Sequence, residues 1–356
     1  MRIRDTFAIA IPTRNGEKFI EQTILSALNQ KRKPDEIIII DDNSSDLTKM
    51  IISKYLNSGI KFFDNNSPDG FAAAWNRLSN VCKSKYITIL HQDDLLSEDY
   101  LFHVEKAFRE FPESGHLYSS CFYINGDDEI IKSPPSPYNL SANRYSGEVY
   151  AQMYFNGIIR NQHIHRCPGV TTLTSLLNDS IKYRQNAGHI ADDDFFLRIG
   201  NLTDIIGISY PLASYRDHNS SVTGSHKYLD FQLSKDWFFQ YKEWHRYDSL
   251  LTEQNAELMF DMTVLFLKRA YIYSVLKNNL DIYKDIVEHH RQLKKFIFDH
   301  NIDKKLPFSI EFLSKYQSKK SKPLVKFLAY YFFSGLHFLK FLNIFKIKKN
   351  YNGSYN

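Results

Sequence analysis

Residues 85–99 read KYITILHQDDLLSED, an apolar run that acidic residues end abruptly. The β-branched and aromatic residues at positions 86–90 predict a buried strand, and Ser97 is expected to cap the helix that follows. Asp93 and Asp94 therefore stand at the carboxyl end of a strand. Two carboxylates there suit either a tight turn or a ligand site, because open α/β sheets bind ligands along that edge. The rest of the chain has to separate these two interpretations.

The N-terminal part of the chain alternates short apolar runs with amphipathic segments. Asn15 is expected to cap the first helix. Strands that alternate with helices of this length indicate an α/β domain with parallel strands and right-handed crossovers. The expected strands are residues 7–11, 36–40, 60–63 and 86–90, and the expected helices are residues 17–29, 47–57 and 71–81.

A polar cluster follows each of these four strands. Because the carboxyl ends of parallel strands lie on one edge of a sheet, the clusters are expected to converge. Their convergence favours a ligand site over four unrelated turns. The four clusters are Pro12-Thr13-Arg14-Asn15, Asp41-Asp42, the loop that contains Asp69, and Asp93-Asp94.

The second half of the chain is less regular. Asp192, Asp193 and Asp194 open a short helix, where one acidic residue would complement the helix dipole and three exceed that need. Beyond about residue 225, apolar residues recur every three or four positions, which indicates a helical extension. The other expected elements are strands at residues 117–124, 169–174 and 205–209 and a loop at residues 215–218.

Cysteine usage restricts the compartment. The chain has three cysteines, Cys82, Cys121 and Cys167, and no CxxC pair. An odd, scattered set argues against a disulfide framework or a zinc ribbon and fits a reducing compartment. The N-terminus, interrupted by Asp5, does not resemble a secretion signal.

Basic residues are concentrated near the C-terminus. Nine of the 45 lysines and arginines lie between Ser314 and Asn350, where no acidic residue occurs. The 40 acidic residues outnumber the basic ones in the rest of the chain, so nucleic acid is not an expected partner. Residues 323–345 are basic and aromatic, which suits a helix on an anionic membrane surface or one packed on the protein's own core.

In their order along the chain, these clusters resemble the motifs of the inverting GT-A glycosyltransferases of family 2. The resemblance covers about residues 7–220 and departs from the family pattern at His91 and Ala191, where the family has acidic residues. The matching stretches are the first strand with its Pro-x-x-Asn turn (residues 9–15), the strand that ends in Asp-Asp-x-Ser (36–44), the Asp-x-Asp region (91–94), the Glu-Asp…Leu-x-Leu-Arg stretch (192–198) and the Tyr-Arg-x-His motif (215–218).

The resemblance implies a GT-A fold, a Rossmann-like mixed α/β sheet, in residues 1–222. A helical extension (223–304) and the basic tail (305–356) would follow. Asp192 matches the family's catalytic base, with Asp193 as a competitor for that role. Asp93 and His218 match positions that hold Mn²⁺ or Mg²⁺, hard cations that prefer oxygen ligands, and nothing in the sequence suits zinc. The residues expected to bind the nucleotide sugar are Pro12, Thr13, Arg14, Asn15, Asp41, Asp42, Asp69, Asp94 and Arg216.

The activity implied by the resemblance is transfer of a sugar, with inversion, from a nucleotide diphosphate sugar such as a UDP-sugar. The acceptor would be a saccharide or a lipid-linked saccharide in cell-surface polysaccharide synthesis, at the cytoplasmic face of the plasma membrane. Two alternatives stay open: a nucleotidyltransferase on a GT-A-like sheet, and a non-catalytic GT-A binding module, which His91 and Ala191 motivate. A dinucleotide-dependent oxidoreductase is disfavoured because no GxGxxG follows the first strand.

Overall fold

The computed structural model describes residues 4–65, 70–218, 229–247, 252–276, 280–302 and 306. Asp69 and the basic tail beyond residue 306 lie outside the described residues, so their predicted roles stay predictions. None of the helices in this described part combines the length and apolarity that crossing a membrane requires.

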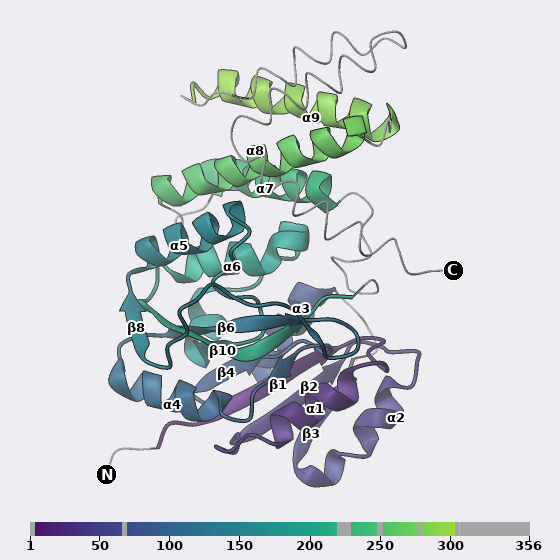
Figure 1. Cartoon of the computed structure of the whole chain (residues 1–356), viewed down its shortest axis with the longest axis vertical. Helices are drawn as coiled ribbons and strands as arrows, with labels where there is room; N and C mark the ends of the chain where they lie inside the picture. Colours follow the sequence, from purple (N-terminus) through teal and green to yellow (C-terminus); the bar gives the residue numbers. More distant parts are fainter. Residues whose placement is uncertain are drawn as a thin grey trace. The chain divides into compact units, whose positions relative to one another are not determined.

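Four parallel strands form one half of the sheet (Figure 1). In spatial order they are β3 (Ile60–Asp64), β2 (Glu36–Asp41), β1 (Phe7–Thr13) and β4 (Tyr86–Ile89). Helices α1 (Ile20–Leu28), α2 (Thr48–Ser53) and α3 (Phe71–Val81) connect them in the chain. The alternation of strands and helices, and the parallel pairing that it predicts, are confirmed in this half.

The other half of the sheet mixes strand directions. Strand β9 (Val170–Leu173) runs antiparallel to both β4 and β6 (His116–Ile124), and β6 pairs in parallel with the long β10 (Ile205–Arg216). Three short strands complete the ten-stranded sheet. They are β5 (Leu95–Leu96) and β8 (Ala142–Tyr145), both antiparallel to β10, and β7 (Ile130–Lys132), antiparallel to β6.

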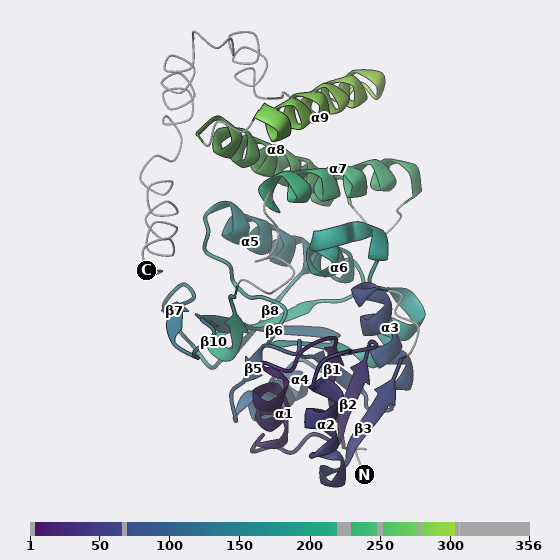
Figure 2. The same ribbon diagram turned by 90° about the vertical axis from the view of Figure 1, so that its right-hand side faces the viewer.

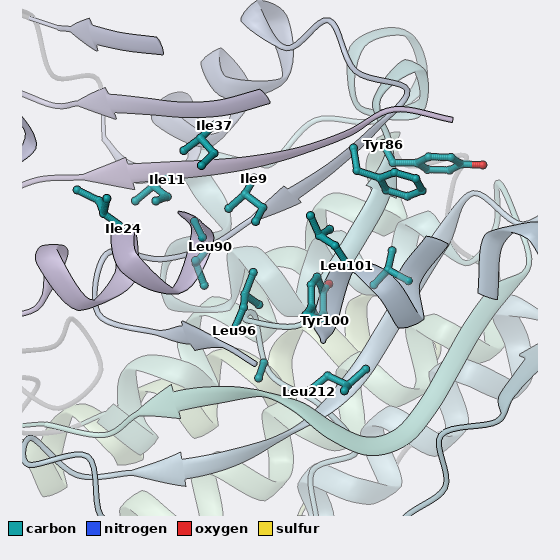
Figure 3. Packing of buried hydrophobic residues seen from close by; sticks show 14 of the residues in the cluster. Ile9, Ile11, Ile24, Ile37, Tyr86, Leu90, Leu96, Tyr100, Leu101 and Leu212 are labelled. Atoms are coloured by element: carbon teal, nitrogen blue, oxygen red, sulfur yellow. The ribbon is translucent and has the colours of Figure 1, made fainter. Parts of the chain in front are cut away.

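The parallel strands are buried on both faces. Side chains alternate between the faces, so Phe7, Ile9 and Ile11 of β1 join one cluster with apolar residues of α1, α2 and α4 (Tyr100–Glu110). Figure 3 shows Ile9, Ile11 and Ile24 in this cluster. The intervening Ala8 and Ala10 are fully buried as well, and α3 contacts β1 and β2. This two-sided burial explains why the strands read as continuous apolar runs.

Two further helices flank the second half of the sheet: α5 (Gly147–Ile159) and α6 (Ala191–Ile199). Short helical turns lie at Leu56–Ser58, Leu176–Ser180 and Gln185–Ile190. The C-terminal helices are α7 (Leu229–Tyr247), α8 (Glu253–Leu276) and α9 (Leu280–Asp299), labelled in Figure 2. The helical extension expected beyond residue 225 is therefore present.

The chain divides into two compact units. One contains Met1–Lys227 and Phe239–Phe260, and the other contains Tyr228–Phe238 and everything from Asp261 onward. Within the second unit, the Ser234 hydroxyl on α7 donates to the Thr263 carbonyl at 2.9 Å and lies 3.2 Å from His289 Nε2, which ties α7, α8 and α9 together. The functional residues predicted from the sequence fall in the first unit.

Three local predictions are wrong. Helix α4 begins at Tyr100, so Ser97 precedes it and Asp99 occupies the N-cap position, without a side-chain hydrogen bond. Helix α1 begins at Ile20, and Asn15 adopts a left-handed conformation (φ 51°) instead of capping it. Tyr215 and Arg216 are the last residues of β10 rather than a loop, because the strand continues beside β6 as far as Ile124.

Candidate active site

Gln92 joins the turns that follow β1 and β4. Its Oε1 accepts hydrogen bonds from the Thr13 hydroxyl (2.6 Å) and the Arg14 backbone N–H (2.8 Å), and its Nε2 donates to the Arg14 carbonyl at 3.1 Å. A side chain added at Gly16 would lie 2.4 Å from the same Oε1, so the turn fits closely around the amide. The structure thus brings together two of the strand ends that were predicted to converge.

The ends of β1 and β2 are joined in a similar way. The Asn15 N–H donates to Ser44 Oγ at 2.8 Å, and Asn15 Oδ1 accepts from the Ser45 N–H at 2.9 Å. The Asp41 carboxylate is fully buried and accepts from the Ser44 N–H at 2.8 Å. Asn15 and Asp41 therefore shape this edge of the sheet through the polypeptide's own hydrogen bonds.

Asp42 is held in place by a cation from α3. Its Oδ1 accepts from Arg77 Nη2 at 2.9 Å and from the Asn65 side-chain amide. Only 7% of the Asp42 side chain is exposed, so this charge-assisted pair lies largely out of water. The arrangement fixes the position of the carboxylate at the end of β2.

Asp93 and Asp94 differ sharply in their surroundings. Asp93 Oδ2 lies 2.9 Å from His218 Nε2, which brings the two predicted metal ligands into contact. Asp94 is buried and accepts from the Arg216 N–H at 2.8 Å, while its Oδ2 has no hydrogen-bond partner among the described residues. Burial, reinforced by the neighbouring charge of Asp93, raises the pKa of Asp94 well above its ordinary value.

Arg216 holds the loop that carries these two carboxylates. Its Nε donates to the Asp93 carbonyl at 2.7 Å, its two other nitrogens reach Asn125 O and Gln22 Oε1 at 3.0 Å, and Asp128 pairs with the guanidinium. The guanidinium also lies 4.5 Å from the centre of the Phe19 ring. The side chain is fully buried, a placement that suits a positioning residue more than a phosphate ligand.

The three consecutive aspartates at the start of α6 have three environments. Asp194 is fully buried and pairs with Arg198 at 2.6 Å, which accounts for its place in the helix. Asp193 accepts a hydrogen bond from the Tyr154 hydroxyl on α5, and burial raises its pKa to about 6. Asp192 accepts from the Cys167 thiol and lines a small cavity.

This cavity lies beside the end of β4. Its volume is about 10 Å³, and Asp192, Cys167, His91 and Trp75 line it together with apolar side chains. The His91 ring stacks on Trp75, with ring centres 5.1 Å apart and planes 16° from parallel. His91 thus links the predicted base to the Asp93-Asp94 turn, and Trp75, interpreted from the sequence as a core residue, also borders the cavity.

Arg166 is a cation that sequence reasoning missed. Its guanidinium lies 4.9 Å from the centre of the Tyr215 ring, and its charge opposes the upward pKa shifts of Asp94 and Asp193. Its Nε is buried and has no hydrogen-bond partner within the described ranges. No motif marks Arg166 or Cys167, because both lie in the segment where the sequence pattern is weakest.

Two kinds of comparison bear on the family of this chain. Residues 8–166 match the family profile described as Glycosyl transferase family 2. The chain is 35% identical over 134 residues to the UDP-Glc:alpha-D-GlcNAc-diphosphoundecaprenol beta-1,3-glucosyltransferase WfaP of Escherichia coli, which covers 36% of this chain and 51% of WfaP. It is 25% identical over 236 residues to WfgD, an Escherichia coli protein of the same description, which covers 65% of this chain and 83% of WfgD.

A solved structure has the same fold. The chain superposes on S. aureus TarS in complex with UDP-GlcNAc with a TM-score of 0.58 and 18% identity, covering 91% of this chain and 87% of that one. At this identity the likeness concerns the fold alone, and it agrees with the mixed sheet described above. Residues 8–166 are therefore a glycosyl transferase family 2 domain, and the sheet that contains them has the GT-A fold.

Proposed function

We propose that the chain is a metal-dependent, inverting glycosyltransferase. It moves a sugar from a nucleotide diphosphate sugar, such as a UDP-sugar, to a saccharide or lipid-linked saccharide acceptor in cell-surface polysaccharide synthesis. One observation carries the proposal: Asp192 and His91 line one cavity, and His91 precedes the Asp93-Asp94 turn at the end of β4. The printed names of WfaP and WfgD, which include a UDP-sugar and a diphosphoundecaprenol-linked sugar, support the substrate classes.

The donor nucleotide is proposed to bind at the ends of β1 and β2. Asp42, positioned by Arg77, would accept a hydrogen bond from an N–H of the base, and the turn from Pro12 to Asn15 would enclose the ribose. Gln92 keeps that turn rigid from the β4 side. A pocket whose walls are fixed by such hydrogen bonds loses little conformational entropy when the ligand binds.

The Asp93–His218 pair fits a divalent cation such as Mn²⁺ or Mg²⁺. Asp93 Oδ2 and His218 Nε2 are 2.9 Å apart, close enough for both to be ligands of one ion, and a carboxylate is a preferred ligand of a hard cation. When bound, the cation would neutralise charge that develops on the departing diphosphate. Arg216 keeps Asp93 in position through its backbone carbonyl.

Asp192 is the proposed general base. Its carboxylate would accept the proton of the acceptor hydroxyl as that oxygen attacks C1 of the sugar from the face opposite the nucleoside diphosphate, which inverts the anomeric centre. The Cys167 thiol donates to Asp192 Oδ2 and orients the carboxylate. Asp193 is less suited to this role because its hydrogen bond with Tyr154 holds it on the α5 side.

Arg166 is proposed to contribute charge to the phosphates. A buried guanidinium nitrogen without a partner in the described part of the chain is costly unless a ligand satisfies it. Guanidinium groups bind phosphate oxygens in a forked geometry, which a lysine cannot reproduce. Arg166 would thereby offset the carboxylate that His91 replaces in the family's Asp-x-Asp region.

The test compares Asp93→Asn and Asp192→Asn with the wild-type chain. A thermal-shift screen of nucleotide sugars first identifies the donor, because a ligand that binds only the folded state raises the melting temperature. Transfer and donor hydrolysis are then measured with and without Mn²⁺. Removal of a general base lowers a rate by about 10²- to 10⁴-fold, so we expect the kcat of Asp192→Asn to fall within that range.

The matched control is Asp179→Asn, which removes an exposed carboxylate elsewhere in the same unit. It should transfer sugar at the wild-type rate. Asp93→Asn should lose its response to Mn²⁺ while still binding the nucleoside part of the donor. Transfer that persists in both Asp93→Asn and Asp192→Asn would overturn the proposed mechanism.

A further inference from the structure

Three potential metal ligands of unlike chemistry meet in the cavity beside β4. The ligand atoms of His91, Cys167 and Asp192 all lie within 4.8 Å of one another. Their chain positions are far apart, so only the fold brings them together. Imidazole nitrogen, thiolate sulfur and carboxylate oxygen form a ligand set that zinc accepts, with a water molecule as the usual fourth ligand.

The surroundings favour a single ion over a larger ligand. At about 10 Å³ the cavity is near the minimum size for one water molecule, so a sugar ring does not fit in it. Apolar side chains, among them Ile87, Ile89 and Val170, form the rest of its wall. Low surrounding polarity strengthens the attraction between a cation and charged ligands.

We infer that His91, Cys167 and Asp192 form a second metal site, selective for Zn²⁺ and separate from the hard-cation site at Asp93 and His218. On binding, the S–H bond of Cys167 breaks, its proton passes to solvent, and a sulfur–zinc bond forms. Thiolate ligands select zinc over manganese and magnesium. The sequence offered no sign of this site, and the expectation that nothing here suits zinc is revised.

Occupation of this site has a consequence for turnover, and this part of the inference rests on the proposed function. A carboxylate bound to Zn²⁺ has lost the lone pair with which it would accept a proton. Zn²⁺ is therefore expected to inhibit sugar transfer even when Mn²⁺ is saturating. Because the two ions use different residues, excess Mn²⁺ should not restore the rate.

Binding is tested without reference to activity. Co²⁺, a spectroscopic substitute for Zn²⁺, is titrated into the full-length chain, and the sulfur-to-cobalt charge-transfer absorption is recorded. We expect the band in the wild-type chain and in Cys82→Ser, and none in Cys167→Ser. Zn²⁺ should displace Co²⁺ from the wild-type chain and abolish the band.

His91→Asn provides a second test that leaves the thiol in place. Loss of a residue that only supports a metal ligand lowers affinity by about 10- to 100-fold, so loss of the ligand itself should weaken binding by at least that much. His91 is partly exposed, so this variant is expected to fold even if Cys167→Ser does not. The inference is overturned if the wild-type chain gives no band, or if His91→Asn binds Co²⁺ as tightly as the wild type.

Transfer assays with Zn²⁺ then test the inhibition. Each variant is compared with its own rate in the absence of Zn²⁺, and Cys167→Ser should require at least about tenfold more Zn²⁺ for half-inhibition. A wild-type chain that binds Co²⁺ but transfers no sugar would contradict the proposed function and leave the metal site intact. Inhibition that is equal in Cys167→Ser and Cys82→Ser would show that zinc acts elsewhere.

Discussion

At the scale of single residues, neighbours of identical type have separate tasks. Asp192, Asp193 and Asp194 follow one another in α6, yet a thiol, a phenol and a guanidinium contact them. Helical geometry turns each successive side chain by about 100°, so three adjacent residues face three different parts of the protein. The sequence pattern identifies such a cluster but does not assign the roles within it.

The raised pKa of Asp193 gives a prediction for stability. An ordinary aspartate has a pKa of 3.8 and Asp193 one of about 6, so the folded chain holds an extra proton between these values. Stability from this group is therefore present below about pH 4 and is lost as the pH rises to about 6, by at most about 3 kcal/mol. Asp193→Asn lacks this loss, and urea unfolding should find its stability relative to wild type rising between pH 4.5 and pH 7.5.

Asp179→Asn serves as the control because its carboxylate is exposed. Its stability relative to the wild type should stay nearly constant over the same pH range. A constant difference for Asp193→Asn would mean that its pKa is the same in the folded and unfolded chains.

Part of the site could be predicted from residue types alone. Asp93 and His218 were paired as metal ligands from their motifs, and they are in contact; their role as ligands stays a proposal. Arg216 was expected at the phosphates, but a motif identifies a residue without its partners, and its guanidinium is buried among groups from four other parts of the chain. Cys167 could not be assigned, because its importance depends on a contact with a residue distant in sequence.

At the scale of elements, the close approach of two helices controls the position of the proposed base. A side-chain carbon added at Gly147, the first residue of α5, would lie 1.7 Å from the carbonyl oxygen of Gly200, just after α6. Only a residue without a side chain permits this packing. Helix α5 supplies Tyr154 and α6 supplies Asp192, so their spacing affects the site directly.

Gly147→Ala is therefore expected to destabilise the fold by about 3 kcal/mol, near the upper end for overpacked positions. It should also lower kcat, since α6 must move to relieve the clash. Urea unfolding and transfer assays measure the two effects. Gly126→Ala is the control, because the nearest side-chain atom would be Lys18 Nζ at 3.6 Å, an ordinary contact. Equal effects of the two substitutions would contradict this account.

The parallel half of the sheet was predictable, and the antiparallel half much less so. Strands β1 to β4 are buried on both faces and alternate with helices, which leaves a clear apolar pattern. Strand β9 has the sequence VTTL, and its pairing with β4 and β6 depends on distant partners rather than on its own composition. The length of β10 was underestimated because its irregular register beside β6 interrupts the expected pattern.

At the scale of the whole molecule, charge is separated along the chain. We propose that the basic tail brings the enzyme to the cytoplasmic face of an anionic membrane, where a lipid-linked acceptor would be found. Each lysine near such a surface contributes about 1 kcal/mol. Replacing Lys346, Lys348 and Lys349 by glutamine should therefore weaken binding to phosphatidylserine vesicles by roughly 100-fold, measured by co-sedimentation of the full-length chain.

A variant with the same loss of charge in the first unit provides the comparison. Lys33, Lys83 and Lys106 are exposed, and their replacement by glutamine should change vesicle binding far less. Equal losses in the two variants would mean that net charge, rather than the tail, governs membrane binding. No loss in the tail variant would contradict the proposed membrane role of these lysines.

The stacking of Trp75 on His91 gives the protein a built-in optical reporter. The chain has three tryptophans, and Trp75 is the one whose ring borders the cavity of His91 and Asp192. Indole fluorescence is sensitive to the group in contact with the ring, so ion binding in the cavity changes the emission of Trp75 without any added label. With Trp237 and Trp244 replaced by phenylalanine, the remaining emission would follow events at the proposed base in real time.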